Sequence, residues 1–524
     1  MTHSTNVGSA GTLTGVTPAH ASDAAIRTEL WFRRGLWVAS VLAALAILIS
    51  GGIMLWAQNE LSPPESVVAA HSWMLANQGT LYYDLNQYPY TVSAYMPVFY
   101  SLEAGLIKLG LPAFTAGRLL SFTAFLGILW VTARTVRVYT NNPTYEWIAT
   151  LLVGICPLTI WWGAVGQVDI LAIFFAVSAF YQFSRHDVLG ESTLWRAAVL
   201  SGLALFTKQT MVGAPVAIVV VLAIRDWKKA LRFALGLGVP LAILILTLNS
   251  LLDGRFLQNT VFANMNPLSG EKLLAQLQYF GGVCGGLLVI VIAATTGIRR
   301  NLAPFVYVAC SALVFLGTAP KVGSDTNYQL ELSIALAICA AVGLHQLDFL
   351  NLYFRGSKSW VTLLVLPLAV HIVVGVRVAS NMFVARVMNE QLFRAEVTAL
   401  QPHVAAEGGR VLSTDFNAMV RLRHRMDIEP LIYGLLVNAG LVDPEPVRRD
   451  LERGAFSTVI LHEDVFHPQS AGNRELAALP ASQLDEIRRH YRLAAHVPGP
   501  FLDGVYVYEP ATDNPPKAGE QLAQ

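Results

Sequence analysis

Charged residues are scarce in this chain. Asp, Glu, Lys and Arg make up only 14% of its 524 residues, and 54% are hydrophobic. Soluble domains carry about 25% charged residues. The formal net charge of +1 gives no basis for nucleic-acid binding through bulk charge. The composition excludes an ordinary soluble domain and indicates a polytopic membrane protein.

Cysteine and metal-binding patterns are equally sparse. The four cysteines all lie in apolar segments, and no CxxC, HxxxH or DxD pattern occurs. We interpret the cysteines as small buried hydrophobic residues. We expect no cofactor and no metal ligand. A divalent metal stays open, but no residue pattern indicates one.

Long apolar runs predict the membrane spans, because a helix of about 20 apolar residues crosses a bilayer. Eleven segments are predicted, at residues 36–57, 113–133, 146–162, 168–184, 196–207, 211–224, 230–249, 277–296, 302–319, 328–345 and 360–377. The first is too long for a signal-peptide core and no cleavage site follows it, so we expect an anchor. Residues 1–28 lack periodicity and predict a disordered cytoplasmic tail.

The basic residues predict an orientation. With a cytoplasmic N-terminus, the cytoplasmic loops hold fifteen Lys and Arg residues and the outer loops hold five. This bias follows the positive-inside rule. Residues 95–111 are apolar, but they contain Glu103 and Lys108, and counting them as a span would invert every later loop. We therefore expect an interfacial or re-entrant helix there.

The other domains follow from these boundaries. Residues 29–377 form the predicted membrane module, with a first outer loop at 58–112, which is long enough to suggest a functional role. Residues 378–510 are richer in charge and alternate short strand-like and helical runs, which predicts an extracytoplasmic α/β domain. Residues 511–524 are predicted to be loose.

Five ionisable side chains collect at the predicted outer face: Glu65, Asp169, Lys208, Arg118 and Lys321. Such groups at membrane depth are functional candidates by default. Each also has a purely structural interpretation. Glu65 suits the first turn of a helix and Asp169 suits a helix cap. Lys208 can extend its ammonium group to the interface, and the other two can anchor at headgroup depth.

An ordered series of short motifs resembles the GT-C glycosyltransferases. The similarity is greatest to the bacterial branch of lipid A aminoarabinose transferases and protein O-mannosyltransferase-like enzymes, which use polyprenyl-phosphate sugars. It covers roughly residues 30–380. The motifs are Glu65 before Met74-Leu75 and Gly79, a Tyr-x-Pro run containing Tyr95, Ala116-Gly117-Arg118-Leu119-Leu120-Ser121, Gly166-Gln167-Val168-Asp169, Thr207-Lys208 and Asn327-Tyr328.

The resemblance implies a site and a reaction. Members of this family often have Asp where Pro64 stands here, so the carboxylate pair that could hold a metal is missing and Glu65 remains. Glu65 would then be the general base of an inverting transfer. Lys208 would be the first candidate to stabilise the leaving phosphate, and Arg118 and Lys321 would be the next. Asp169, Gln167, Tyr95 and Tyr328 complete the predicted substrate-binding set.

The resulting hypothesis is a glycosyltransferase of the bacterial plasma membrane. It would use a polyprenyl-phosphate-linked sugar and a lipid, glycan or protein acceptor outside the cytoplasm, among membrane lipids and without nucleic acid. Two alternatives remain. A secondary transporter could use residues 196–224 as a broken helix, although no internal repeat is visible. The loss of an acid at Pro64 also fits a catalytically inactive relative that acts in envelope assembly.

Overall fold

The computed structural model describes residues 23–297, 301–349, 363–404, 409–422, 426–467, 479–499 and 504–511. The predicted N-terminal tail lies outside these residues up to residue 22. Its last part, residues 23–28, is helical rather than disordered, because the first helix already begins at Asp23. The predicted C-terminal tail also lies outside them, except for residue 511.

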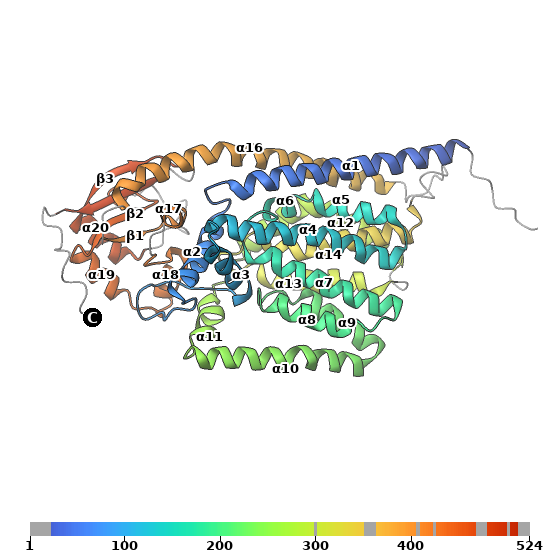
Figure 1. Cartoon of the computed structure of the whole chain (residues 1–524), viewed down its shortest axis with the longest axis horizontal. Coiled ribbons are helices and arrows are strands. Elements are labelled where there is room, and N and C mark those ends of the chain that lie inside the picture. Colours follow the sequence, from blue (N-terminus) through green and yellow to red (C-terminus); the bar gives the residue numbers. More distant parts are fainter. Residues whose placement is uncertain are drawn as a thin grey trace, which may run out of the picture.

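The membrane part is a bundle of helices arranged side by side along the long axis of the molecule (Figure 1). Its elements are α1 (Asp23–Trp56), α4 (Ala113–Thr140), α5 (Pro143–Gly154), α6 (Pro157–Trp162), α7 (Val168–Leu189), α8 (Leu194–Leu205), α9 (Gly213–Arg225), α10 (Trp227–Leu251), α12 (Gly270–Ala293), α13 (Leu302–Thr318), α14 (Leu330–Gln346) and α16 (Val365–Val404).

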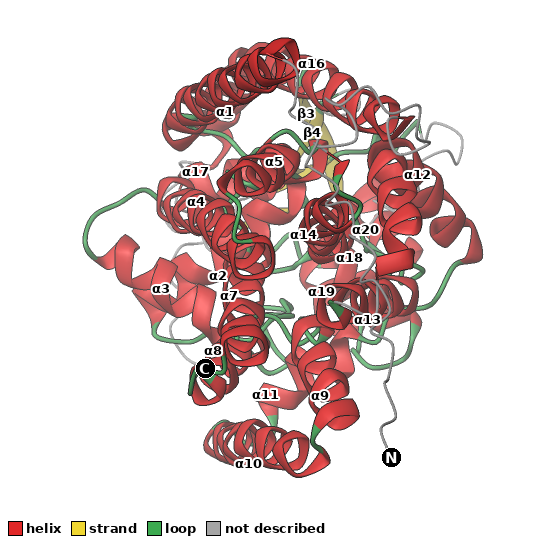
Figure 2. Ribbon diagram, turned by 90° about the vertical axis from the view of Figure 1, so that its right-hand side faces the viewer, coloured by secondary structure: helices red, strands yellow, loops and turns green. Residues whose placement is uncertain are grey.

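The helices occupy distinct layers of the bundle. Seen end-on, α14 lies inside the bundle, α1 and α16 run together along one side, and α10 stands at the opposite side (Figure 2). All but the last two residues of α14 are buried, whereas only Ala230 and Phe233 are buried on α10. Exposed leucines and isoleucines on α1 and α10 fit contact with lipid rather than water.

Every predicted span coincides with helical structure, with two differences. Residues 146–162 are divided into α5 and α6, because Pro157 cannot continue the preceding helix and starts a new one. The segment 360–377 begins outside the described residues. Seven described helices are long and apolar enough to cross a membrane, and α8, α9 and α13 are shorter apolar helices. The total of eleven spans stays a prediction.

The first outer loop is folded around two helices, α2 (Pro63–Gln78) and α3 (Pro97–Lys108). Proline stands in the first turn of each, where no intrahelical N–H partner is needed. α2 ends at Gly79, which takes the left-handed conformation with φ 75° and donates its N–H to the Leu75 carbonyl. α3 has only 12 residues, as expected for an interfacial or re-entrant helix rather than a span.

The C-terminal part contains a four-stranded sheet in the order β1-β2-β4-β3. The strands are β1 (Arg410–Ser413), β2 (Phe456–Leu461), β3 (Tyr491–Val497) and β4 (Val505–Pro510), and the helices around them are α17 (Phe416–Leu422), α18 (Pro430–Asn438), α19 (Glu445–Glu452) and α20 (Ala481–His490). β1 and β2 are parallel and the other pairs are antiparallel. The sheet lies at one end of the bundle (Figure 1).

The first outer loop packs directly onto this sheet domain. Tyr90 forms a parallel β-bridge with Ile428, and its ring lies 5.5 Å from that of Tyr433. On the other side, Met74 of α2 belongs to the same buried cluster as Leu400 of α16. The loop therefore contacts both the membrane bundle and the C-terminal domain.

Candidate outer-face site

Glu65 is held in the first turn of α2 by the two prolines before it. Its carboxylate is completely buried. Oε1 accepts from Arg118 Nε at 2.8 Å and from the Gly166 N–H at 2.7 Å, and Oε2 accepts from Arg118 Nη2 at 2.8 Å and from the Leu61 N–H at 2.6 Å. Each oxygen therefore already has two donors, and the bidentate pair with Arg118 is a strong and geometrically specific contact.

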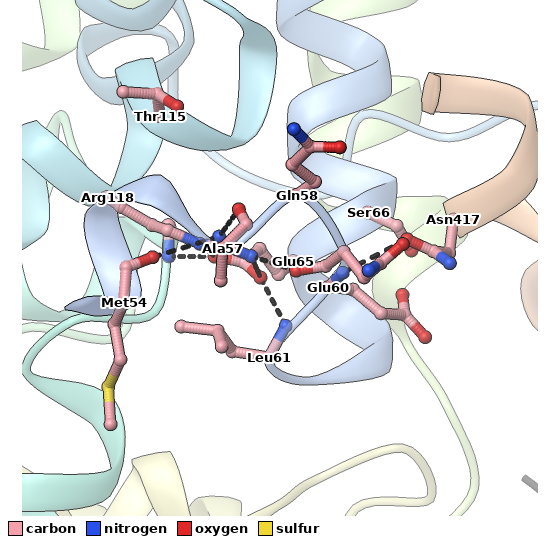
Figure 3. A network of polar contacts seen from close by, with 12 residues as sticks. Met54, Ala57, Gln58, Glu60, Leu61, Glu65, Ser66, Thr115, Arg118 and Asn417 are labelled. Atoms are coloured by element: carbon pink, nitrogen blue, oxygen red, sulfur yellow. Dashed lines mark hydrogen bonds and ion pairs between the residues drawn. The ribbon is translucent and has the colours of Figure 1, made fainter. Parts of the chain in front are cut away.

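Arg118 also closes the end of the first span. The guanidinium group lies in the middle of the network in Figure 3 and donates to the backbone carbonyls of Met54, Ala57 and Asn59. These carbonyls lie at the end of α1 and in the loop that follows, where no further helical N–H group is present to donate to them. Arg118 is completely buried. It fastens the start of the first outer loop to α4.

Two glycines let the second outer turn reach Glu65. A Cβ atom on Gly166 would lie 3.2 Å from Glu65 Oε1 and 3.1 Å from the Gly117 carbonyl carbon, and one on Gly117 would lie 2.4 Å from Glu103 Oε1. Only hydrogen side chains permit this approach of backbone to backbone. The small residues of the Ala-Gly-Arg and Gly-Gln-Val-Asp motifs are thus explained by packing.

Asp169 and Lys208 form a second buried ion pair. Lys208 Nζ lies 2.5 Å from Asp169 Oδ1, and the two side chains are 1% and 0% exposed. Asn327 donates to the other carboxylate oxygen at 3.1 Å. The ammonium group also faces two partly exposed rings, at 4.2 Å from the centre of Tyr328 and 5.5 Å from that of Tyr95. This is a desolvated cation flanked by aromatic faces.

Lys321 lies close to this pair but has a different environment. Its ammonium group contacts Asn264 Oδ1 at 2.5 Å, and no carboxylate lies within ion-pair distance of it among the described residues. Burial, with a smaller contribution from the charge of Lys208, lowers the pKa of Lys321 to about 8. Its charge is therefore available to an anion at this face.

Gln167 lies between the two ion pairs in sequence and is fully buried. Its backbone N–H contacts the Ser121 hydroxyl at 3.3 Å, but neither atom of its side-chain amide has a hydrogen-bond partner among the described residues. A buried amide without partners is uncommon. Gln167 is the residue of this turn whose polar atoms remain unused.

The structure thus divides the predicted site residues into two groups. Glu65 and Arg118 form one, and Asp169, Lys208, Tyr95, Tyr328 and Lys321 form the other, with the turn of Gly166 and Gln167 between them. Tyr82 and Tyr90, which also belong to the first outer loop, are buried in packing contacts. No group of three or more His, Cys, Asp or Glu residues able to hold a metal occurs in the part of the chain that the structure describes.

Sequence reasoning missed the polar contacts of the residues just before α2. The Glu60 N–H donates to Asn417 Oδ1 at 3.0 Å, and Arg421 Nη1 donates to Asn59 Oδ1 at 2.6 Å. Asn417 and Arg421 belong to α17, more than 350 positions along the chain. In the sequence, Glu60 is recognisable only as an acid five residues before Glu65. Nothing in the sequence marks it as a functional residue.

An apolar groove opens between α8 and α10. Its volume is about 700 Å³. It follows the whole of α8, about 18 Å, from Trp195 to Phe206, which stands two residues before Lys208. Lys229 and Arg232, in the first turns of α10, also line the groove. α8 and α9 are separate helices with residues 206–212 between them.

Comparisons with known proteins place this geometry in a known fold. No family model and no curated protein matches the chain. The solved structure of ArnT from Cupriavidus metallidurans in the apo state has a TM-score of 0.62 at 15% identity, over 90% of this chain and 97% of that chain. ArnT bound to undecaprenyl phosphate has a TM-score of 0.60 at 14% identity over the same shares.

A second type of structure is also similar. An oligosaccharyltransferase from Archaeoglobus fulgidus, in complex with Zn and sulfate, has a TM-score of 0.52 at 12% identity, over 86% of this chain and 71% of that chain. Identities this low establish the fold alone. The chain therefore has the polytopic fold of the GT-C membrane glycosyltransferases.

Proposed function

We propose that this chain is a membrane glycosyltransferase that moves a sugar from a polyprenyl-phosphate carrier to an acceptor outside the cytoplasm, with inversion. The observation that carries the proposal is the joint presence of a cation cluster at the outer face and an apolar groove that ends beside it, on this fold. ArnT has been solved with undecaprenyl phosphate and the archaeal oligosaccharyltransferase with dolichol phosphate.

The cluster suits a lipid-linked phosphate. Lys208 is compensated by Asp169, whereas the charge of Lys321 has no carboxylate partner among the described residues. A phosphate that enters beside Lys321 would form a charge-assisted contact in a partly desolvated site. Tyr95 and Tyr328 would offer ring faces to the sugar or to the first isoprene units.

The groove suits the carrier chain. A phosphate at Lys208 and Lys321 would bring the lipid past Phe206 and down between α8 and α10, where the walls are almost wholly apolar. Burying such a chain gains roughly 25 cal/mol per Å² of apolar surface. The proposed orientation places Lys229 and Arg232, at the far end, in the cytoplasm, and the sheet domain outside.

Sugar transfer in membranes that contain the protein tests the function. A panel of labelled undecaprenyl-phosphate-linked pentoses, hexoses and amino sugars should include at least one donor for the wild-type chain. If no donor is used while the protein is folded and the endogenous acceptor is present, the proposal is wrong. A transporter or an inactive relative would then explain the chain better.

Filling the groove tests the route of the carrier. Gly236 of α10 lines the groove and has open space around it, so Gly236→Phe should obstruct the groove and raise the KM for the lipid-linked donor about tenfold or more. Gly238→Phe is the matched control, because Gly238 is equally open but does not line the groove. Equal KM values for the two variants would place the carrier elsewhere.

Glu65 stays the predicted base of this reaction on the family resemblance. In the present geometry, however, it could accept a proton only after releasing donors that now saturate it.

A further inference from the structure

Glu60 stands in the short loop between α1 and α2. Unlike Glu65, which is fully buried, it is partly exposed. Figure 3 shows it beside Asn417 and Ser66, on the side of the loop that faces the C-terminal domain. No basic side chain forms an ion pair with it among the described residues. Its carboxylate is therefore free of the contacts that saturate Glu65.

The loop that carries Glu60 is fixed at three consecutive residues. The Asn59 carbonyl accepts from Arg118, the Glu60 N–H donates to Asn417, and the Leu61 N–H donates to Glu65. These contacts tie the loop to α4, to α17 and to α2. A side chain on a backbone held in this way is pre-organised, which an effective acid or base requires.

The surroundings of Glu60 come from the membrane part and from the C-terminal domain. Asp415, two residues after β1, and Glu396 of α16 interact electrostatically with it, as do Glu65 and Arg118. Arg421 and Glu390 contact the loop one and two residues earlier. Burial is the main cause that raises the pKa of Glu60 to about 8, and Asp415 and Glu65 add to it, against the Ser66 hydroxyl and Arg118.

We propose that Glu60, and not Glu65, is the carboxylate that takes the proton from the acceptor hydroxyl, and that Glu65 and Arg118 position it. This inference rests on the proposed glycosyltransferase function. The acceptor oxygen forms a bond to the anomeric carbon as the bond from that carbon to the carrier phosphate breaks. The electron pair leaves with the phosphate, the hydroxyl proton moves to Glu60, and Glu60 later releases it to water.

The placement gives the C-terminal domain a role. Because Glu60 faces α17 and the end of β1, the acceptor would approach between the membrane bundle and the sheet domain. The donor would approach from the side of Lys208 and Lys321. A general base whose pKa lies near the working pH combines a usable ionised fraction with strong proton affinity.

Three matched variants test the assignment: Glu60→Gln, Glu65→Gln and Glu390→Gln, assayed with the donor that the wild type uses. Glu60→Gln should lower the transfer rate about 10²–10⁴-fold and leave the melting temperature in detergent unchanged or higher. Glu65→Gln should lower the melting temperature, because Arg118 would lose part of a buried pair. Glu390→Gln should retain activity. Full activity of Glu60→Gln in a folded protein would overturn the proposal.

The pH profile gives a second readout. The wild-type rate should rise with pH and level off above about 8, because only the ionised carboxylate can accept a proton. Glu60→Asp should keep a measurable rate with a displaced profile. A rate independent of pH between 6 and 9 would contradict the role of Glu60.

A measurement that needs no donor separates this inference from the proposed function. Dicyclohexylcarbodiimide reacts with accessible protonated carboxyl groups. Glu60 is partly exposed and has a pKa of about 8, so at pH 7 the reagent should modify Glu60, and peptide mass spectrometry should find the enclosed Glu65 unmodified. If the wild type transfers no sugar yet Glu60 is labelled, the glycosyltransferase proposal fails and the reactive carboxyl stands. Labelling of Glu65 with Glu60 unmodified would overturn the assignment directly.

Discussion

At the scale of single residues, two acids of one loop have opposite environments. Glu65 accepts four hydrogen bonds from protein donors, so both of its carboxylate oxygens are already engaged. Glu60 keeps partial exposure and few partners, so its charge is less stable but accessible. The contacts that let Glu65 fix the loop leave neither of its oxygens free for an acceptor hydroxyl. The stabilising effect of the ion pair also depends on both partners, because one buried charge alone is strongly destabilising.

The pair of Lys208 and Asp169 allows structural and binding roles to be separated. Lys208→Ala leaves the Asp169 carboxylate buried and without its cation, so unfolding in detergent should require about 3–5 kcal/mol less free energy. It should also weaken donor use if Lys208 contacts the phosphate. The double variant Lys208→Ala/Asp169→Ala removes both charges and should recover much of the stability.

The donor KM of the double variant decides the role of the lysine. Stability that returns while the KM stays high supports a phosphate contact. A KM that returns together with the stability would show that Lys208 acts only through the fold.

At the scale of elements, the close contact between α4 and the turn before α7 depends on glycine. Gly166→Ala would push its Cβ against the Gly117 backbone and Glu65, and should cost about 1–3 kcal/mol of stability. Gly105→Ala on α3 is the matched control, because nothing lies within 4 Å of its Cβ position and alanine favours a helix. Thermal unfolding of both variants in the same detergent provides the comparison. A stable Gly166→Ala variant would show that the turn can move away from α4 at little cost.

At the scale of the whole molecule, the membrane orientation can be tested by cysteine labelling without interference from the native cysteines. The chain's four cysteines are buried, so a membrane-impermeant maleimide should leave the wild type unlabelled. Gln87→Cys lies on an exposed position of the first outer loop and should be labelled on intact cells. Ser192→Cys, exposed between α7 and α8, should react only after the membrane is opened.

The reverse pattern would place the N-terminus outside. It would also put the proposed site in the cytoplasm and contradict the charge asymmetry of the loops. The experiment therefore bears on the membrane topology and on the proposed function together.

Local patterns of the sequence determined the membrane elements and much of the C-terminal domain. Apolar length marked each predicted span. The short strand-like runs Arg410–Ser413, Thr458–His462 and Gly504–Tyr508 coincide with β1, β2 and β4, because burial in lipid or in a sheet depends mainly on residues near in sequence. β3 was missed, since Tyr491–Val497 follows a charged helix directly and most of its residues are exposed or partly so. The split of residues 146–162 into α5 and α6 was also missed.

The sequence predicted the residues of the site but not how they pair. The sequence identified Glu65, Arg118, Asp169, Lys208 and Lys321 as unusual, because charge at membrane depth is costly wherever it occurs. Which of them pair could not be known, because Arg118 lies 53 positions from Glu65 and Lys208 lies 39 from Asp169.

Only the tertiary structure decided that Glu65 is enclosed and that Glu60 faces the C-terminal domain. Arg118 and Gly166 enclose Glu65, whereas Asn417 contacts Glu60 from more than 350 residues along the chain. A carboxylate's chemistry depends on its solvation and its partners, and these are properties of the assembled fold.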